Sequence, residues 1–160
     1  MKRRGVFAGS FDPFTNGHLY ILTKASKLFD EVIVLIMQNP DKKNILSLET
    51  RIELIKEIIK PVLNARVDSA NGYTVDYANK VEAQYLIRGI RNIKDMDFEL
   101  KLAMANKELA PNIETVFIMA DKEHEKIASS KIIEMFINGK DISTCVDEIV
   151  IKALKNQLKN

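Results

Sequence analysis

The sequence predicts an α/β domain with a five-stranded parallel sheet covered by helices on both faces. Short apolar, β-branched segments alternate about five times with segments whose apolar residues recur every three or four positions. Such strand-then-helix units form parallel sheets, because each helix carries the chain back to the start of the next strand. With 160 residues, 46% hydrophobic and 29% charged, the chain is expected to form one globular domain, residues 1–160.

Five short apolar segments are the expected strands. The clearest spans residues 32–37, six consecutive apolar side chains typical of a central parallel strand that is buried on both faces. The other four expected strands are residues 5–8, 65–69, 85–87 and 115–119.

Six helices are expected between and after these strands. The first begins near Thr15 or Asn16, either of which is a suitable N-cap, and runs to about residue 29. The second starts after Ser47 and stops before Pro61, since proline cannot continue a helix. The remaining predicted helices are residues 74–81, 95–109, 130–137 and 146–158.

Charge and cysteine content exclude several classes of protein. The net charge of +2 is too small to indicate nucleic acid or a membrane surface as a partner. The single cysteine, Cys145, excludes an internal disulfide and a multi-cysteine zinc site, and it favours a reducing, cytoplasmic location. The longest aliphatic run has six residues, too few to span a membrane.

The loop after the first strand carries the sharpest functional signal. In parallel sheets, ligands bind beyond the carboxyl ends of the strands. Here Gly9 permits close backbone approach, Ser10 offers a hydroxyl, and His18 lies in the first turn of a helix, where free N–H groups favour an anion. A lone histidine more often caps or packs locally, but the flanking glycines and the hydroxyl favour a phosphate site.

The motif Thr15-Asn16-Gly17-His18 resembles the nucleotidyltransferase signature: His or Thr, any residue, Gly, His. The wider segment, residues 9–18, is similar to the bacterial phosphopantetheine adenylyltransferases, and the similarity extends over nearly the whole chain, most weakly at residues 62–80 and in the last helix. The resemblance implies a Rossmann-like, doubly wound fold. It also implies transfer of AMP from ATP to 4′-phosphopantetheine, giving dephospho-coenzyme A and pyrophosphate in coenzyme A biosynthesis.

Alternatives remain open, because the signature is shared. Nicotinate-mononucleotide adenylyltransferases and small cytidylyltransferases also carry it, so a different acceptor or a CTP-dependent reaction is possible. A nucleotide-binding module without catalysis is the alternative from another class. The absence of an added acceptor domain and the run Leu86-Ile87-Arg88-Gly89-Ile90-Arg91 favour the phosphopantetheine enzymes.

The loops after the second and fourth strands supply cations. Lys42, in the loop 39–43, is either part of a solvated turn or a mobile charge that bridges phosphates. Arg88 and Arg91 flank a glycine and offer planar, bidentate donors for phosphate oxygens. The resemblance implies that Lys42 binds the substrate phosphates, that Arg88 contacts phosphopantetheine, and that residues 89–91 contact ATP.

Two further segments are implied for ATP. Glu99 matches a family glutamate of the ATP site, although on its own it would be interpreted as an exposed helical acid. Ser129 and Ser130 are interpreted either as an N-cap or as a phosphate cradle, since both use the same groups. Asp95 and Asp97 are expected to be solvated or capping. The residues implied for ATP are Ser10, Phe11, His18, Gly89, Ile90, Arg91, Glu99, His124, Glu125, Lys126, Ile127, Ala128, Ser129 and Ser130.

The residues implied for 4′-phosphopantetheine are Ser10, Lys42, Thr74, Arg88 and Asn106; those implied for catalysis are His18, Lys42 and Ser10. Direct in-line attack by the substrate phosphate, without a covalent enzyme intermediate, is expected. Mg²⁺ is expected on the ATP phosphates with few protein ligands, and no metal ligand is assigned. The family further implies a homohexamer and coenzyme A as a feedback ligand.

Several positions depart from the family pattern. Ala8 stands where proline is common, Ala128 where a serine usually begins a triplet, and His124 where an aromatic residue is often found near adenine. Thr74 occupies a position that often gives an apolar contact to the pantetheine arm. The expected contacts are therefore least secure around Thr74 and His124.

Overall fold

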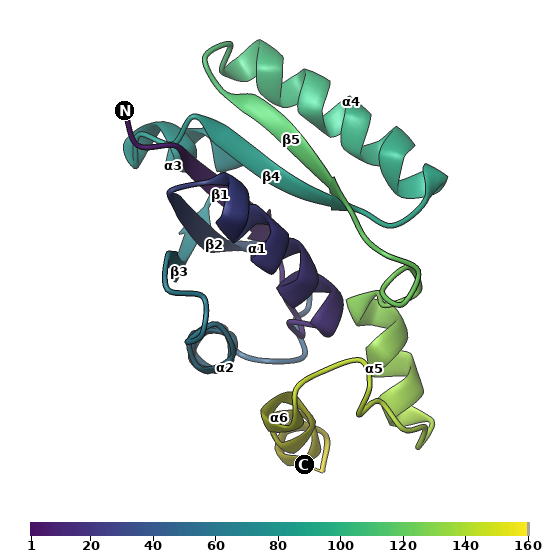
Figure 1. Ribbon diagram of the computed structural model, residues 1–160. Helices are drawn as coiled ribbons and strands as arrows, with labels where there is room; N and C mark the ends of the chain where they lie inside the picture. The colour runs from purple at the N-terminus through teal and green to yellow at the C-terminus, as the bar shows by residue number, and fades with distance from the viewer. Residues whose placement is uncertain (160) are drawn as a thin grey trace.

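The predicted alternation of strands and helices is present in the computed structural model, which describes residues 1–159 (Figure 1). Each expected element is found at its expected place in the chain. In order, the elements are β1 (Arg4–Gly9), α1 (Asn16–Leu28), β2 (Glu31–Gln38), α2 (Leu48–Ile58), β3 (Ala65–Asn71), α3 (Thr74–Lys80), β4 (Tyr85–Ile90), α4 (Ile93–Leu109), β5 (Glu114–Met119), α5 (Ser129–Ile137) and α6 (Glu148–Leu158).

All strand pairs of the sheet are parallel, in the order β3-β2-β1-β4-β5. The chain builds outward from β1 to β3 on one side, then returns to place β4 on the other side of β1. The order therefore reverses between β1 and β4, and a crevice opens at the carboxyl ends of two such strands. The loops after β1 and β4, which hold the strongest sequence motifs, meet at this reversal.

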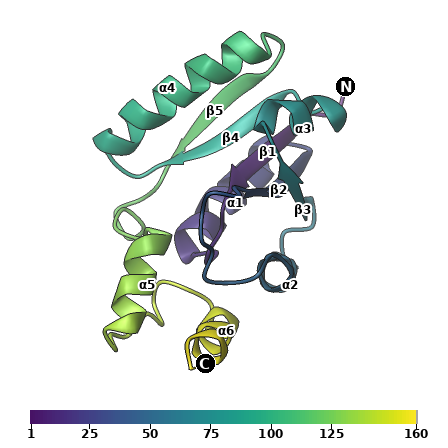
Figure 2. The ribbon, with the colours of Figure 1, turned by 180° about the vertical axis from the view of Figure 1, so that it is seen from behind.

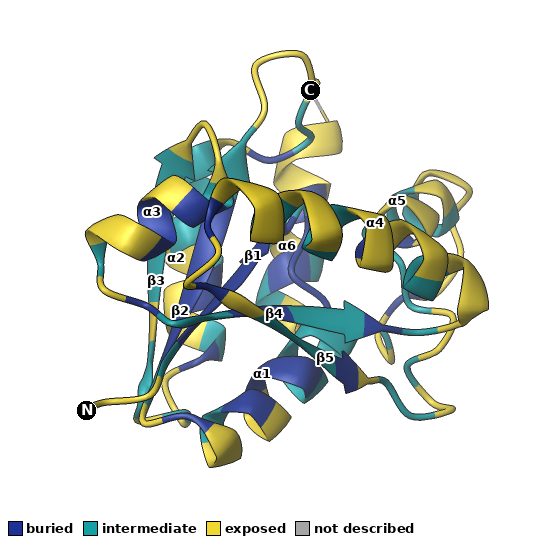
Figure 3. Ribbon diagram, turned by 90° about the horizontal axis from the view of Figure 1, so that it is seen from above, coloured by how far each residue is buried: buried dark blue, intermediate teal, exposed yellow. Residues whose placement is uncertain are grey.

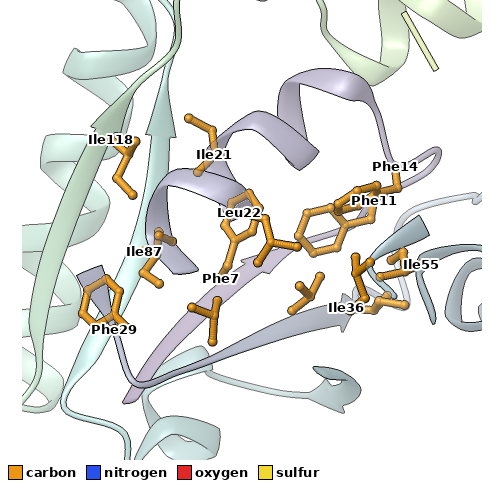
Figure 4. Close-up of a cluster of buried hydrophobic side chains, with 14 residues drawn as sticks. Phe7, Phe11, Phe14, Ile21, Leu22, Phe29, Ile36, Ile55, Ile87 and Ile118 are labelled. Carbon is orange, nitrogen blue, oxygen red and sulfur yellow. The ribbon is translucent and has the colours of Figure 1, made fainter. Parts of the chain in front are cut away.

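Helices cover both faces of the sheet, as predicted. On one face, α1 and α2 bury a cluster that includes Phe7, Leu22, Ile55 and Ile87, drawn in Figure 4. On the other face, α3 packs through Val75 and Ala78 onto the opposite side of β1, β2 and β4. Seen from above in Figure 3, α3 and α4 lie above the sheet and α1 lies below it. Figure 2 shows α4 running alongside β4 and β5.

The two last helices form a third apolar cluster with the loop before α2. Its buried members include Leu46, Ile132, Val150 and Leu154. This cluster places α5 and α6 next to each other at one end of the molecule (Figure 1). The start of α5 thereby comes close to the loop after β1, where the Ser129 Oγ donates to the Pro13 carbonyl at 2.8 Å.

Some boundaries differ from the prediction for local reasons. The N-cap of α1 is Thr15, one of the two predicted residues. Helix α4 begins at Ile93, two residues earlier than predicted, because the Asn92 side chain caps it by accepting from the Asp95 N–H at 3.0 Å. Strand β4 continues through Ile90, so Arg88 lies within the strand and not after it. Between residues 1 and 159, no helix is long and apolar enough to cross a membrane.

Candidate active site

A cavity of about 350 Å³ lies at the carboxyl ends of β1 and β4. A second cavity of about 420 Å³ adjoins it and shares Phe11, His18, Lys42, Ser129 and Ser130 with it. The predicted residues that line the first cavity are Phe11, His18, Lys42, Arg88, Gly89, Ile90, Arg91, Glu99, His124, Ile127, Ala128, Ser129 and Ser130. Ser10 lines the second. Residues from four separate loops therefore converge on one site.

His18 is fixed at the cavity wall by the start of α1. Its backbone N–H donates to the Thr15 Oγ1 at 3.2 Å, and its ring Nδ1 accepts from the Thr15 backbone N–H at 3.0 Å. This reciprocal arrangement is a capping box, in which histidine takes the place usually held by Glu or Gln. Because a backbone N–H can only donate, Nδ1 is unprotonated and the ring proton resides on Nε2.

Three aromatic rings surround the His18 imidazole. The ring centroids of Phe11, Phe14 and Phe7 lie 4.9, 5.4 and 6.2 Å from that of His18. Figure 4 shows these phenylalanines within the core cluster. Removal from water, followed by the charges of Arg91 and Arg88, lowers the pKa of His18 from 6.5 to about 3. The imidazole is therefore neutral at physiological pH and can offer its Nε2–H to an anion.

The loops after β1 and β2 are bound to each other. The Lys42 Nζ donates to the Ser10 Oγ at 3.3 Å. The Asp12 carboxylate accepts from the backbone N–H groups of Ile45 and Leu46 at 2.7 and 2.9 Å. These contacts bring the ammonium group of Lys42 to the cavity, although it lies 32 residues after Ser10 in the chain.

A buried arginine supports the same loop from below. Arg51, only 3% exposed, donates through its guanidinium to the carbonyls of Ser10 at 2.8 Å and Ser47 at 3.3 Å. Sequence reasoning missed Arg51 and missed the role of Asp12. The helical periodicity of residues 48–59 placed Arg51 on no apolar face, and an Asp-Pro dipeptide indicates only a turn.

Arg88 reaches the cavity from β4 and is held on three sides. Its guanidinium forms two 2.7 Å hydrogen bonds with the Glu99 carboxylate and a third, also 2.7 Å, with the Ala8 carbonyl. Glu99 is the buried residue of α4, at 8% exposure. The interpretation of Glu99 as an exposed helical acid is therefore wrong, because Arg88 compensates its burial with a bidentate pair.

Arg91 is held in a similar way by the first turn of α4. Its guanidinium donates to the two Asp95 oxygens at 2.8 and 3.1 Å, and its backbone N–H donates to the same carboxylate at 3.1 Å. Asp95 is thus a partner of an active-site arginine, and the expectation that it is solvated or merely capping is wrong. Asp95 and Glu99 are four residues apart, so they lie on one face of α4.

Gly89, between these two arginines, is a position where α1 packs closely against β4. A Cβ atom at position 89 would lie 3.0 Å from the Ile21 Cγ1, closer than ordinary van der Waals contact. The missing side chain lets α1, with His18 in its first turn, approach β4. The glycine that sequence reasoning assigned to ligand approach therefore has a packing role between two elements of the site.

The segment between β5 and α5 forms the last wall of the cavity. His124 stacks on Tyr20 of α1, with ring centroids 4.9 Å apart and planes inclined by 27°. The N-cap of α5 is Ala128, and no side chain caps this helix. The interpretation of Ser129 and Ser130 as a cap is therefore wrong; both residues line the two cavities at the uncapped helix start.

Four predicted site residues lie outside these two cavities: Thr74, Asn106, Glu125 and Lys126. Thr74 begins α3, and Asn106 lies near the end of α4, half-buried. Glu125 and Lys126 are exposed. Their contacts with substrate remain predictions.

Within residues 1–159, no three His, Cys, Asp or Glu side chains are grouped as a metal centre. The carboxylates nearest the cavities already accept hydrogen bonds: Asp12 from two backbone N–H groups, Asp95 from Arg91 and Glu99 from Arg88. These residues do not fit a resident metal ion. What the cavity can do chemically is to hold and stabilise negative charge.

Comparison with known proteins identifies the family. Residues 6–135 match the family model described as cytidylyltransferase-like. The chain is 40% identical over 153 residues to the phosphopantetheine adenylyltransferase of Alkaliphilus metalliredigens, covering 96% of this chain and 98% of the relative. It is 43% identical over 158 residues to that of Vesicomyosocius okutanii, covering 99% and 100%.

A solved structure supports the fold alone. The protein, from Vibrio parahaemolyticus and described as a nicotinate-nucleotide adenylyltransferase, superposes with a TM-score of 0.70 at 23% identity, covering 98% of this chain and 93% of the other. The sequence similarity is more specific than this likeness, since it extends over nearly the full length of proteins with one shared name. The chain therefore belongs to the phosphopantetheine adenylyltransferases, a family of nucleotidyltransferase enzymes within the cytidylyltransferase-like group.

Proposed function

We propose that this chain transfers AMP from ATP to 4′-phosphopantetheine, forming dephospho-coenzyme A and pyrophosphate. The observation that supports it best is the convergence of His18, Lys42, Arg88 and Arg91 on one cavity. Three of these side chains are cationic, and the fourth is a neutral imidazole that can donate through Nε2. Such a site stabilises transferred phosphate without supplying a nucleophile of its own.

The reaction needs no covalent enzyme intermediate. A phosphate monoester has a second pKa of about 6, so the phosphopantetheine phosphate is largely dianionic near neutral pH and can attack directly. One of its oxygens forms a bond to the α-phosphorus of ATP while the bond from that phosphorus to the β-bridging oxygen breaks. Pyrophosphate leaves with the electron pair, and the acceptor needs no general base.

Each cationic group has a proposed role. Arg88 and Lys42 position the attacking phosphate. Holding the attacking oxygen about 3 Å from the α-phosphorus lowers the reaction barrier by more than the binding contacts alone would. The His18 Nε2–H, Lys42 and the Ser10 hydroxyl stabilise charge on the α-phosphate. Arg91, with the uncapped start of α5 at Ser129 and Ser130, holds the departing pyrophosphate.

Magnesium enters this scheme as part of the nucleotide substrate. Mg²⁺ binds phosphate oxygens readily and keeps several waters, so it can be carried in by ATP. The paired carboxylates of the site support this proposal, and no step is assigned to the ion. The single cysteine continues to favour a reducing, cytoplasmic setting for the enzyme.

We further propose a homohexamer and feedback by coenzyme A. Helix α4 exposes five large apolar side chains: Ile93, Phe98, Leu100, Met104 and Leu109. Exposed apolar side chains in this number on one helix support its burial against other copies of the chain. Light scattering should give six times the monomer mass, and Phe98→Asp should lower it. Coenzyme A contains the pantetheine and adenylate parts of the product, so it should inhibit competitively with both substrates.

The deciding experiment measures pyrophosphate release from Mg-ATP with and without 4′-phosphopantetheine. Nicotinate mononucleotide, and a mixture of CTP with a phosphosugar, serve as decoy substrates. Turnover only with phosphopantetheine, lowered by 10²-fold or more in His18→Ala, is the expected result. Turnover with a decoy instead of phosphopantetheine would show that the proposed acceptor is wrong and that the decoy is the substrate. ATP binding without turnover in any mixture would reduce the chain to a nucleotide-binding module.

A further inference from the structure

The lining of the first cavity contains residues of two chemical kinds. Lys42, Arg88 and Arg91 suit phosphates. Its apolar and aromatic residues, among them Ile21, Ala120, His124 and Ile127, instead suit an uncharged base. Of the other rings that line this cavity, Phe7 and Phe11 are buried and His18 is enclosed by phenylalanines, so His124 is the ring left for a base to stack on. The position of the His124 ring is therefore important for nucleotide binding.

The His124 ring is held from its face and from its edge. Tyr20 stacks against one face, with the ring centroids 4.9 Å apart. The Asp121 carboxylate binds the ring Nδ1 at the edge and also accepts from the His124 backbone N–H at 3.1 Å. The His124 side chain is only 18% exposed. Tyr20 itself does not line the cavity, so its ring supports His124 from behind.

The contact with Tyr20 joins His124 to another element, whereas the hydrogen bonds of His124 stay within the turn between β5 and α5. The backbone hydrogen bonds of His124 run to Asp121 and Ile127, both inside the turn between β5 and α5. Such local bonds shape the turn but do not fix its distance from the rest of the molecule. Tyr20 belongs to α1, two residues after His18. The stack therefore ties the turn to the same helix that places the histidine of the phosphate site.

A cation on the same helix contacts the Tyr20 ring. The Lys24 Nζ lies 5.3 Å from the ring centroid, one turn further along α1. Lys24 does not line the cavity. It therefore provides a matched control, since its removal changes a Tyr20 contact without removing the stack on His124.

We propose that Tyr20 is a positioning residue for nucleotide binding: it holds the His124 ring in place as the platform on which the purine base of the nucleoside triphosphate stacks. The inference rests on the proposed function, in that it places the nucleotide in this cavity. It adds a residue outside the cavity that determines nucleotide affinity through another side chain. His124 forms the wall of the cavity at the base site, and Tyr20 supports it from the far side.

The test is a set of variants read out by two independent measurements. The Kd for Mg-ATP is measured by titration calorimetry, which needs no turnover, and the two KM values are measured by pyrophosphate release. Tyr20→Leu keeps apolar volume against the core but removes the aromatic stack, and Tyr20→Phe keeps the stack. Tyr20→Leu should raise the Kd and KM for ATP about threefold to tenfold, the range of one aromatic pair. The KM for phosphopantetheine and the melting temperature should change little.

Rescue separates positioning from general damage. Tyr20→Phe and Lys24→Ala should retain the ATP affinity of the parent protein. Adding His124→Trp to Tyr20→Leu should recover most of the lost affinity, since a larger ring reaches the base without support. Unchanged ATP affinity in a folded Tyr20→Leu, or equal loss for both substrates, would overturn the proposal. Calorimetric ATP binding with no turnover would reject the proposed acceptor while leaving the Tyr20 test intact.

Discussion

His18 is predicted to make folding stability depend on pH between about pH 3 and pH 6.5. Its pKa is about 3 in the folded protein and returns to 6.5 on unfolding. In that window the unfolded chain binds a proton that the folded protein does not, so stability is full above pH 6.5 and falls as the pH falls. The loss is about 1.4 kcal/mol for each pH unit, or about 2 kcal/mol between pH 8 and pH 5.

The substitution that isolates this effect is His18→Gln. Glutamine is a preferred residue at the third position of a capping box, so it can still accept from the Thr15 N–H. The variant therefore keeps the helix start and has no titratable side chain at position 18. Its free energy of unfolding at pH 8 should be about 1 kcal/mol lower, because aromatic packing is lost. Its stability should change little between pH 8 and pH 5, apart from contributions that it shares with the parent protein.

Urea unfolding at pH 8 and pH 5 measures the difference directly. His124→Gln is the matched control, since it replaces the second of the two histidines and leaves His18 and its capping box in place, so the loss of stability that His18 causes should remain. The reasoning is refuted if His18→Gln loses as much stability toward pH 5 as the parent protein does. That result would mean that the folded protein binds the proton at His18, and that the neutral donor is absent at acidic pH.

Two further predictions concern the loops and strands that carry the cations. Arg88→Ala should raise the Kd for phosphopantetheine and leave the Kd for ATP unchanged; equal loss of affinity for both substrates in calorimetry would contradict the assignment. The same variant should lower the free energy of unfolding by about 3 kcal/mol, because Glu99 is left buried without its partner. Asp12→Ala should lower kcat/KM about tenfold or more, because the loop carrying Lys42 loses two anchoring hydrogen bonds; Asp12→Asn should be milder, and parent-like kinetics for Asp12→Ala would exclude the anchoring role.

The elements could be predicted from sequence because their signals are local. The apolar run of residues 32–37 and the stop at Pro61 each depend on a few adjacent side chains, and the structure has the strand and the helix end where these signals place them. Of the two N-caps that the sequence offers for α1, the structure uses Thr15, and α4 begins two residues before its predicted start because Asn92 caps it.

The partners of the site residues could not be predicted in the same way. Glu99 binds Arg88 across 11 residues, and Arg51 binds the Ser10 carbonyl across 41. Neither pair leaves a periodic pattern, because the fold alone brings the residues together. His18 and Lys42 could be singled out from their places in the loops after strands, and the resemblance added their roles. Asp12, Arg51 and Tyr20, which hold them or their neighbours, needed three-dimensional contacts.

The pairing of both arginines with carboxylates of α4 has a consequence for selectivity. Arg88 and Arg91 each form a bidentate ion pair with one of these carboxylates. An inorganic phosphate therefore has to compete with two ion pairs to bind these guanidinium groups. Phosphate and other small anions are abundant in cells, so this competition affects selectivity. A substrate that also contacts the loops around His18, Lys42 and His124 gains enough binding free energy to compete with the ion pairs. The pairing of the arginines with carboxylates therefore favours the larger substrate over small anions.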